Sequence, residues 1–169
     1  MMRFLFIFLL SVPFVSANAQ VKSDADYLRE YQERISKEYI NKIYIPADLA
    51  DSHQQLDEVM ERDAKIKFMT LTEIEATKKY HFILGRWVIK NWSLDEGSRL
   101  SKYMRDKGVF RSDDMAKYIL LTYHRYLHGN PLGEEELLIQ LAEKYAKEKA
   151  KRAAGQELLH SETRKRKQN

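Results

Sequence analysis

The stretch HFILGRWVIKNWSLDEGSRL, residues 81–100, decides how this chain folds, because it contains both tryptophans of the protein, Trp87 and Trp92. Apolar residues in it and just before it recur every three or four positions, which predicts one broad apolar face on a helix. Gly85 inside this helix costs about 1 kcal/mol relative to alanine, and such a glycine indicates the close approach of another helix. We therefore expect the other helices to pack around this one.

Periodic apolar residues predict helices on both sides of this stretch, and Thr72 with Glu75 fits a capping box at the start of its own helix. The segment at 43–49, IYIPADL, is expected to be extended because of its β-branched residues and Pro46. The charged segment 61–67 either continues the preceding helix or breaks it. The predicted fold is all-α, a compact bundle of about five or six helices with a flexible basic C-terminal tail. The expected helices span residues 23–41, 48–60, 72–91, 98–107, 113–128 and 132 onward.

The N-terminal residues have the pattern of a secretory signal peptide. Arg3 supplies a positive charge, the apolar run FLFIFLLSVPFV follows, and Ala17 and Ala19 match a small-x-small cleavage site. The run is too short for a comfortable transmembrane helix, which needs about 20 apolar residues. We expect cleavage after Ala19 and a periplasmic or secreted protein; the alternative is a buried N-terminal helix. No cysteine follows the run, so a lipid anchor on cysteine is excluded.

Composition divides the remaining chain unevenly. Residues 20–42 are assigned to an N-terminal helix, 43–145 to the helical core domain, and 146–169 to a basic helical extension and disordered tail. Residues 144–169 contain nine Lys or Arg and three Glu, a net charge of +6, so the high pI belongs to this tail. The chain has no cysteine, which excludes disulfides, thiol nucleophiles and thiolate metal sites. No stretch after the signal peptide is long and apolar enough to cross a membrane.

Three segments together carry a family pattern: IYIPADLADSHQQLDEVM, then HFILGRWVIKNWSLDEGSRLSKYMRDKGV, then DDMAKYILLTYHRYLHG. They resemble a family of small helical bacterial domains of unknown function with the motifs YIPxDL, LGxWxxxNW, GSRL, DDM and YHRYLxG. The resemblance extends from about Ile43 to Gly129. Ile83 and the pair Asp95–Glu96 depart from the smaller or aromatic residues expected there, which affects the turn after Trp92. The resemblance implies a shared helical fold, often in exported proteins, and implies no activity.

Polar and aromatic residues near this turn and in the helix at 113–128 form the candidate binding set. Arg99 is expected to face the pair Asp113–Asp114. That pairing is interpreted as a structural clasp between helices, and the alternative is a pocket that binds a partner's carboxylate or peptide. The candidate residues are Trp87, Asn91, Trp92, Arg99, Asp113, Asp114, Tyr123, His124 and Arg125.

Catalytic and metal-binding patterns are weak. His124 and His128 have the i, i+4 spacing of a zinc site, but Arg125 stands where the H-E-x-x-H motif has glutamate. Ser98 could be combined with His124 and Asp113 as a triad, but no G-x-S-x-G elbow is present. We therefore expect no metal, no cofactor and no catalytic residue.

The sequence leaves three functional hypotheses open. The first is a non-enzymatic interaction or binding module for an unknown protein or envelope component. The second is a small hydrolase or metal-dependent enzyme that uses His124. The third is an envelope-associated structural protein that docks weakly on an anionic surface through its tail. No nucleic-acid partner is expected in an exported protein. The basic residues of the tail end are Arg164, Lys165, Arg166 and Lys167.

Overall fold

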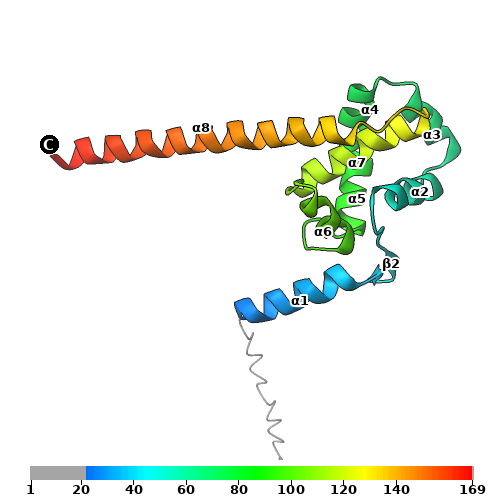
Figure 1. The fold of residues 1–169 in the computed structure, drawn as a ribbon, viewed down its shortest axis with the longest axis horizontal. Helices are drawn as coiled ribbons and strands as arrows, with labels where there is room; N and C mark the ends of the chain where they lie inside the picture. The colour runs from blue at the N-terminus through cyan, green and yellow to red at the C-terminus, as the bar shows by residue number, and fades with distance from the viewer. Residues whose placement is uncertain (1–21, 169) are drawn as a thin grey trace, which may run out of the picture.

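The structure, a computed structural model, describes residues 22–168, with side chains as far as Gly155. Helices dominate it (Figure 1), which confirms the predicted all-α class. The predicted signal peptide and its cleavage site lie outside the described residues. In chain order the elements are α1 Asp24–Ser36, β1 Tyr39–Ile40, β2 Ile43–Tyr44, α2 Leu49–Val59, α3 Arg62–Met69, α4 Glu73–Tyr80, the π turn η1 His81–Gly85, α5 Arg86–Asn91, α6 Arg99–Asp106, α7 Ser112–Leu127 and α8 Glu134–Gln168.

Helices α4, η1 and α5 follow one another without a break, so the described chain contains seven helical segments instead of five or six. The additional one is α3, in the charged segment that the sequence left open. Helix α3 is stabilised by the burial of Phe68, which is 0% exposed and packs in the core. The capping box predicted for Thr72 and Glu75 is present at the start of α4.

The first helix is shorter than predicted, since α1 ends at Ser36 and not near Asn41. Strands β1 and β2 follow and pair antiparallel. The turn between them consists of Asn41 and Lys42, whose φ angles of 50° and 66° lie in the left-handed region that two-residue hairpin turns require. The extended segment expected at 43–49 thus begins as the second strand of a small hairpin.

Helix α7 lies at the centre of the fold. It contacts α2, α3, α4, η1, α5 and α6, and residues on several of its faces are buried. A serine before a helix favours the N-cap position, but Ser112 is the first residue of α7, and the N-cap is Arg111, which makes no side-chain cap bond. Trp92, only 1% exposed, belongs to the core around this helix.

The π turn η1 was not predicted, and the spacing of buried residues explains it. Ala76, Leu84 and Val88 all face the core, separated by multiples of four residues. An α-helix repeats every 3.6 residues, so such positions drift around the helix unless extra residues are inserted. A π turn accommodates one extra residue and returns them to one face. Gly85 approaches α7 as predicted, because a Cβ there would lie 3.5 Å from Leu120 Cδ1.

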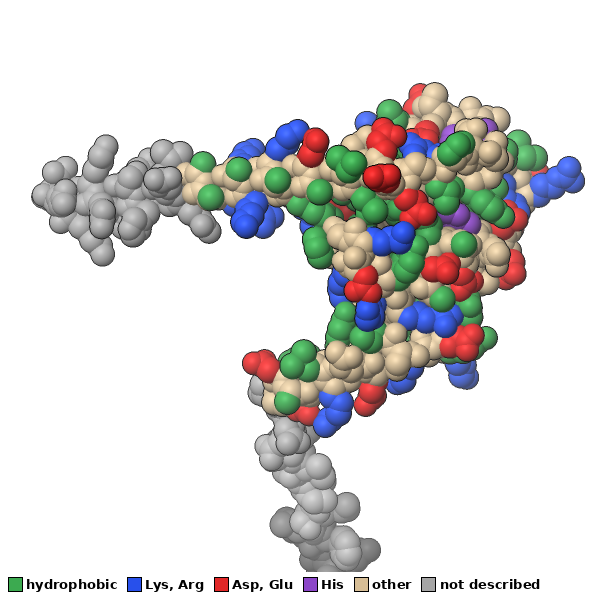
Figure 2. Space-filling model, in the orientation of Figure 1, with side chains coloured by type: hydrophobic (Ala, Val, Ile, Leu, Met, Phe, Trp, Pro, Cys, Tyr) green, Lys and Arg blue, Asp and Glu red, His purple; other side chains and the backbone are tan. Residues whose placement is uncertain are grey.

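Helix α8 docks on the domain at its start and then projects away from it (Figure 1; in space-filling form, Figure 2). Leu137 is buried, and Leu141 packs against the core. The helix has 35 residues and is therefore about 50 Å long. The helix continues to Gln168, whereas a disordered tail was expected within residues 146–169; the segment 156–168 contains strong helix formers and no proline. In the described part of the chain, no helix combines the length and apolarity that a membrane crossing requires.

Candidate functional site

The turn after Trp92 is a packed structural element. The Trp92 ring meets the edge of the Trp87 ring with centroids 5.7 Å apart and planes at 75°. The side-chain amide of Asn91 donates a 2.8 Å hydrogen bond to the Trp87 carbonyl oxygen. Ser93, with a φ of 48°, turns the chain at the end of α5. These candidate residues therefore support one another and the core.

Arg99 does not face Asp113 and Asp114, so that part of the prediction is wrong. Its Nε donates to the Ile45 carbonyl oxygen at 2.6 Å, and its guanidinium lies over the Tyr44 ring at 5.0 Å. The first turn of α6, which carries Arg99, lies against the end of the hairpin, whereas the two aspartates begin the next helix. Arg99 thus clasps the extended segment to α6.

Asp114 joins α7 to α8. Its carboxylate, 4% exposed, accepts hydrogen bonds from Lys144 Nζ at 2.6 Å, Arg111 Nε at 2.9 Å and the Tyr145 hydroxyl at 3.1 Å. Burial opposes ionisation of this carboxyl, but the hydrogen bond and charge of Lys144 outweigh it and hold the pKa below its usual value. Asp113, in contrast, is exposed and lies 3.2 Å from His81 Nε2.

Tyr123, His124 and Arg125 connect α7 to its other neighbours. The Tyr123 hydroxyl donates to Asp57 at 3.3 Å, and His124 Nε2 lies 3.0 Å from the Leu71 carbonyl oxygen. Arg125 forms a bidentate pair with Glu73 at 2.7 and 2.9 Å. The hydrogen bond from Arg125 lowers the pKa of Glu73. The nine candidate residues therefore take part in several separate contacts between elements, and no single pocket brings them together.

The weak catalytic patterns do not assemble. His124 and His128 stack with ring centroids 4.4 Å apart, and His128 Nδ1 lies 2.9 Å from the His124 carbonyl oxygen. Ser98 is buried and accepts from the Ser101 amide as the cap of α6, so it is not exposed as a nucleophile. Across residues 22–155, no group of three or more His, Asp or Glu side chains could hold a metal ion.

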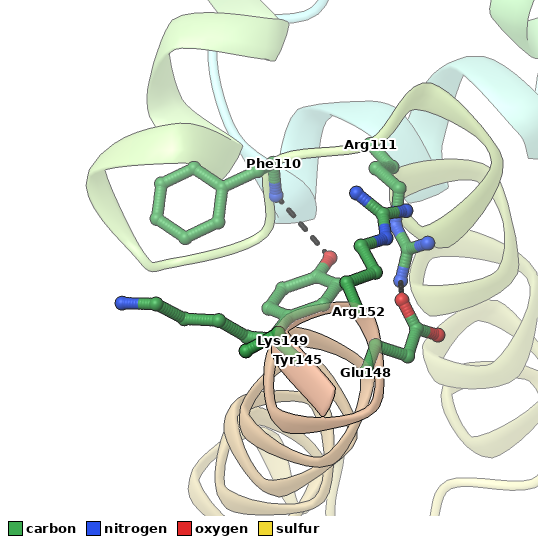
Figure 3. A pocket seen from close by; sticks show the side chains of 7 residues that line it. Phe110, Arg111, Tyr145, Glu148, Lys149 and Arg152 are labelled. Atoms are coloured by element: carbon green, nitrogen blue, oxygen red, sulfur yellow. Dashed lines mark hydrogen bonds and ion pairs between the residues drawn. The ribbon is translucent and has the colours of Figure 1, made fainter. Parts of the chain in front are cut away.

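A groove at the base of α8 is the strongest candidate site (Figure 3). It has a volume of about 440 Å³ and lies between the α6–α7 loop and α8; we call it the α8 groove. Phe110 is 60% exposed, and its ring centroid lies 5.8 Å from that of Tyr145. The lining residues are Phe110, Arg111, Tyr145, Glu148, Lys149, Arg152 and Ala153.

The α8 groove contains one basic side chain that is paired within the described part of the protein and two that are not. Arg111 stacks on the Tyr145 ring at 4.9 Å and pairs with Glu148 at 2.9 Å, so its charge is largely satisfied inside the protein. The hydrogen bond from Arg111 lowers the pKa of Glu148. Lys149 and Arg152 are exposed, and neither has a hydrogen-bond or ion-pair partner among the side chains that the structure describes. The groove thus offers an aromatic wall beside two available cations.

Sequence reasoning did not find this groove, although it contains two detectable signals. Phe110 is an aromatic residue in a short loop after Gly108, and Tyr145 is the last large apolar residue of the α8 stripe. The two residues are 35 positions apart, and the segment after Tyr145 was expected to be a basic helical extension. Only the docking of α8 beside that loop brings them together.

Comparison with known proteins gives a family match for the central part of the chain. Residues 45–127 match the model of a family described as a domain of unknown function, DUF6794. This match confirms the resemblance to a small helical domain of unknown function, which had been traced from about Ile43 to Gly129. The matched residues contain the core helix α7 and end before α8. No curated protein and no solved structure matches the chain.

Proposed function

We propose that this protein is an exported, non-enzymatic binding module whose α8 groove binds an acidic, partly apolar ligand, such as an acidic peptide segment of an envelope protein. The observation that carries the proposal is the exposed Phe110 ring over Tyr145, with Lys149 and Arg152 free beside it. The signal-peptide pattern of the first 19 residues supports export.

The chemistry of the groove favours such a ligand. Aromatic side chains provide contact area at low conformational cost, and guanidinium and ammonium groups bind carboxylates through charge-assisted hydrogen bonds. Because Lys149 and Arg152 are exposed, their attraction for a ligand is screened by salt within about 8 Å at physiological ionic strength. The groove should therefore bind moderately, and more tightly at low salt.

The contacts that hold His124 inside the protein favour a binding module over an enzyme that uses this histidine. His124 is 7% exposed and is held against the Leu71 carbonyl oxygen, and its ring packs on His128. A general base must reach the proton that it abstracts from a substrate. A buried imidazole occupied by a backbone carbonyl is poorly placed for that role.

A decapeptide of alternating glutamate and phenylalanine tests the proposal by fluorescence anisotropy. The double variant Lys149→Glu/Arg152→Glu should weaken binding by about tenfold or more, equal to about 1.4 kcal/mol. Lys147→Glu/Lys151→Glu is the matched control, because it changes the net charge equally on the same helix but outside the groove. If both double variants weaken peptide binding equally, the peptide is attracted only by the net charge of the helix, and the α8 groove is not its binding site.

A further inference from the structure

The outer side of the helix formed by α4, η1 and α5 carries large apolar side chains that point into solvent. Ile74 is 77% exposed, Phe82 68% and Ile83 75%. Scattered apolar residues on a surface are ordinary, but three of this size on one helix form an unpartnered patch.

The π turn aligns this patch with basic residues. Ile74, Lys78, Phe82, Arg86 and Lys90 follow one another at steps of four residues, as the buried positions on the opposite side do. Without the extra residue of η1, such a row would drift around the helix. The same distortion that brings the buried residues to the core therefore also gathers these side chains on one outer face.

The charge of this face is positive. Its cations are Lys78, Lys79, Arg86 and Lys90, all exposed, and none has an ion-pair partner within residues 22–155. The acidic side chains nearby are largely engaged elsewhere. Glu75 closes the capping box with Thr72, and Glu73 is bound by Arg125. Asp113, on the neighbouring helix, lies against His81.

We propose that this face, with Phe82 and Ile83 at its centre and Lys78, Lys79, Arg86 and Lys90 around them, docks the protein on an anionic phospholipid membrane surface. Charge complementarity selects this occupant. A helix with apolar side chains flanked by Lys and Arg lies flat on a membrane, with its apolar groups at the acyl boundary and its cations at the phosphates. Each basic residue near an anionic surface contributes about a fivefold gain in binding.

The shape of the face favours a membrane over a protein partner. The apolar side chains of Phe82 and Ile83 protrude, and neither residue lines the shallow hollow beside Leu71, Glu75, Lys78 and Lys79. Protruding side chains can enter a fluid headgroup layer without a matching pocket. This docking face is separate from the α8 groove. An experiment can therefore reject membrane docking without rejecting the proposed binding of an acidic ligand, and the reverse.

Vesicle co-sedimentation tests the proposal with the exported form that begins at Gln20. The probes are vesicles of phosphatidylcholine alone and vesicles with one third phosphatidylglycerol. We expect binding to the anionic vesicles only, and at least a tenfold loss in Phe82→Ser/Ile83→Ser and in Lys78→Glu/Lys79→Glu. These side chains are exposed, so thermal unfolding should show unchanged stability. Lys149→Glu/Arg152→Glu is the charge-matched control and should bind the vesicles as the unaltered protein does.

Three outcomes would overturn the proposal. The first is vesicle binding unchanged in both face variants. The second is binding lost equally in the groove variant or only on deletion of 156–169, which would assign the attraction to net charge or to the basic tail. The third is absence of binding to either vesicle, with Phe82→Ser/Ile83→Ser instead disrupting a stoichiometric complex with a protein, which would make the face a protein interface.

Discussion

The Lys144 ammonium lies 2.6 Å from the Asp114 carboxylate, which is 4% exposed, and this pair joins α8, ten residues after its start at Glu134, to the first turn of α7. Tyr145, the next residue along α8, donates to the same carboxylate and also forms the floor of the α8 groove. One buried anion therefore positions both the projecting helix and the aromatic wall of the proposed site.

Asp114→Asn should lower the free energy of unfolding by about 2 kcal/mol, because hydrogen bonds to a charged group each contribute about 1.5–3 kcal/mol and the amide keeps only part of the network. Urea denaturation measures the loss. Hydrogen exchange should also quicken in 134–150 before it does in α7. Unchanged protection of α8 in this variant would contradict the role assigned to Asp114. Asp113→Asn is the control, since Asp113 is exposed and forms no hydrogen bond or ion pair with the described side chains of α8.

Acidification should destabilise the protein through His53. The Thr122 hydroxyl donates to the Tyr118 carbonyl oxygen at 2.8 Å, so its oxygen accepts from the Nε2–H of a neutral His53 at 3.0 Å. Burial lowers the pKa of His53 from 6.5 to about 4. Below pH 6.5, His53 is therefore protonated in the unfolded chain but stays neutral in the folded protein. The free energy of unfolding falls as the pH decreases toward 4.

The expected loss from this residue between pH 7 and pH 5 is about 2 kcal/mol. Urea unfolding at the two pH values measures it, and His53→Gln, whose amide can still donate to Thr122, should remove that part of the pH dependence. If the two proteins lose the same stability between pH 7 and pH 5, His53 is not the titrating group.

Gly85→Ala should destabilise the domain by about 1 kcal/mol. The added methyl would lie 2.9 Å from His81 Nδ1 and 3.5 Å from Leu120 Cδ1, and the cost of overpacking exceeds the gain in helix propensity. Gly155→Ala is the matched control, because nothing lies within 4 Å of a Cβ at that position, and it should be neutral or stabilising. A stabilised Gly85→Ala would show that the π turn relaxes easily.

Apolar periodicity predicted most of the fold, because the helices bury regular stripes and have recognisable caps. Helix α7 and the Thr72 cap follow from local sequence alone. Two features required tertiary information. The π turn depends on which residues of 73–91 face α7, and α3 is a short charged helix that Phe68 holds in place.

The candidate site could be predicted only in part, because its contacts join residues far apart in the sequence. Arg99 meets Ile45 across 54 positions, and Phe110 meets Tyr145 across 35. Residue types alone suggested that Trp92 and Arg99 were unusual, and the structure assigns them to the core and to a clasp. No spacing rule identifies which loop a projecting helix will lie beside.

The most direct test of the α8 groove is a nuclear magnetic resonance titration of the protein with the glutamate–phenylalanine decapeptide. We predict shifts of the backbone amides of Phe110 and Arg111 and of residues 148–153, with the amides of 91–99 unchanged. Shifts centred on 91–99, or none at a peptide concentration that saturates the anisotropy signal, would contradict it.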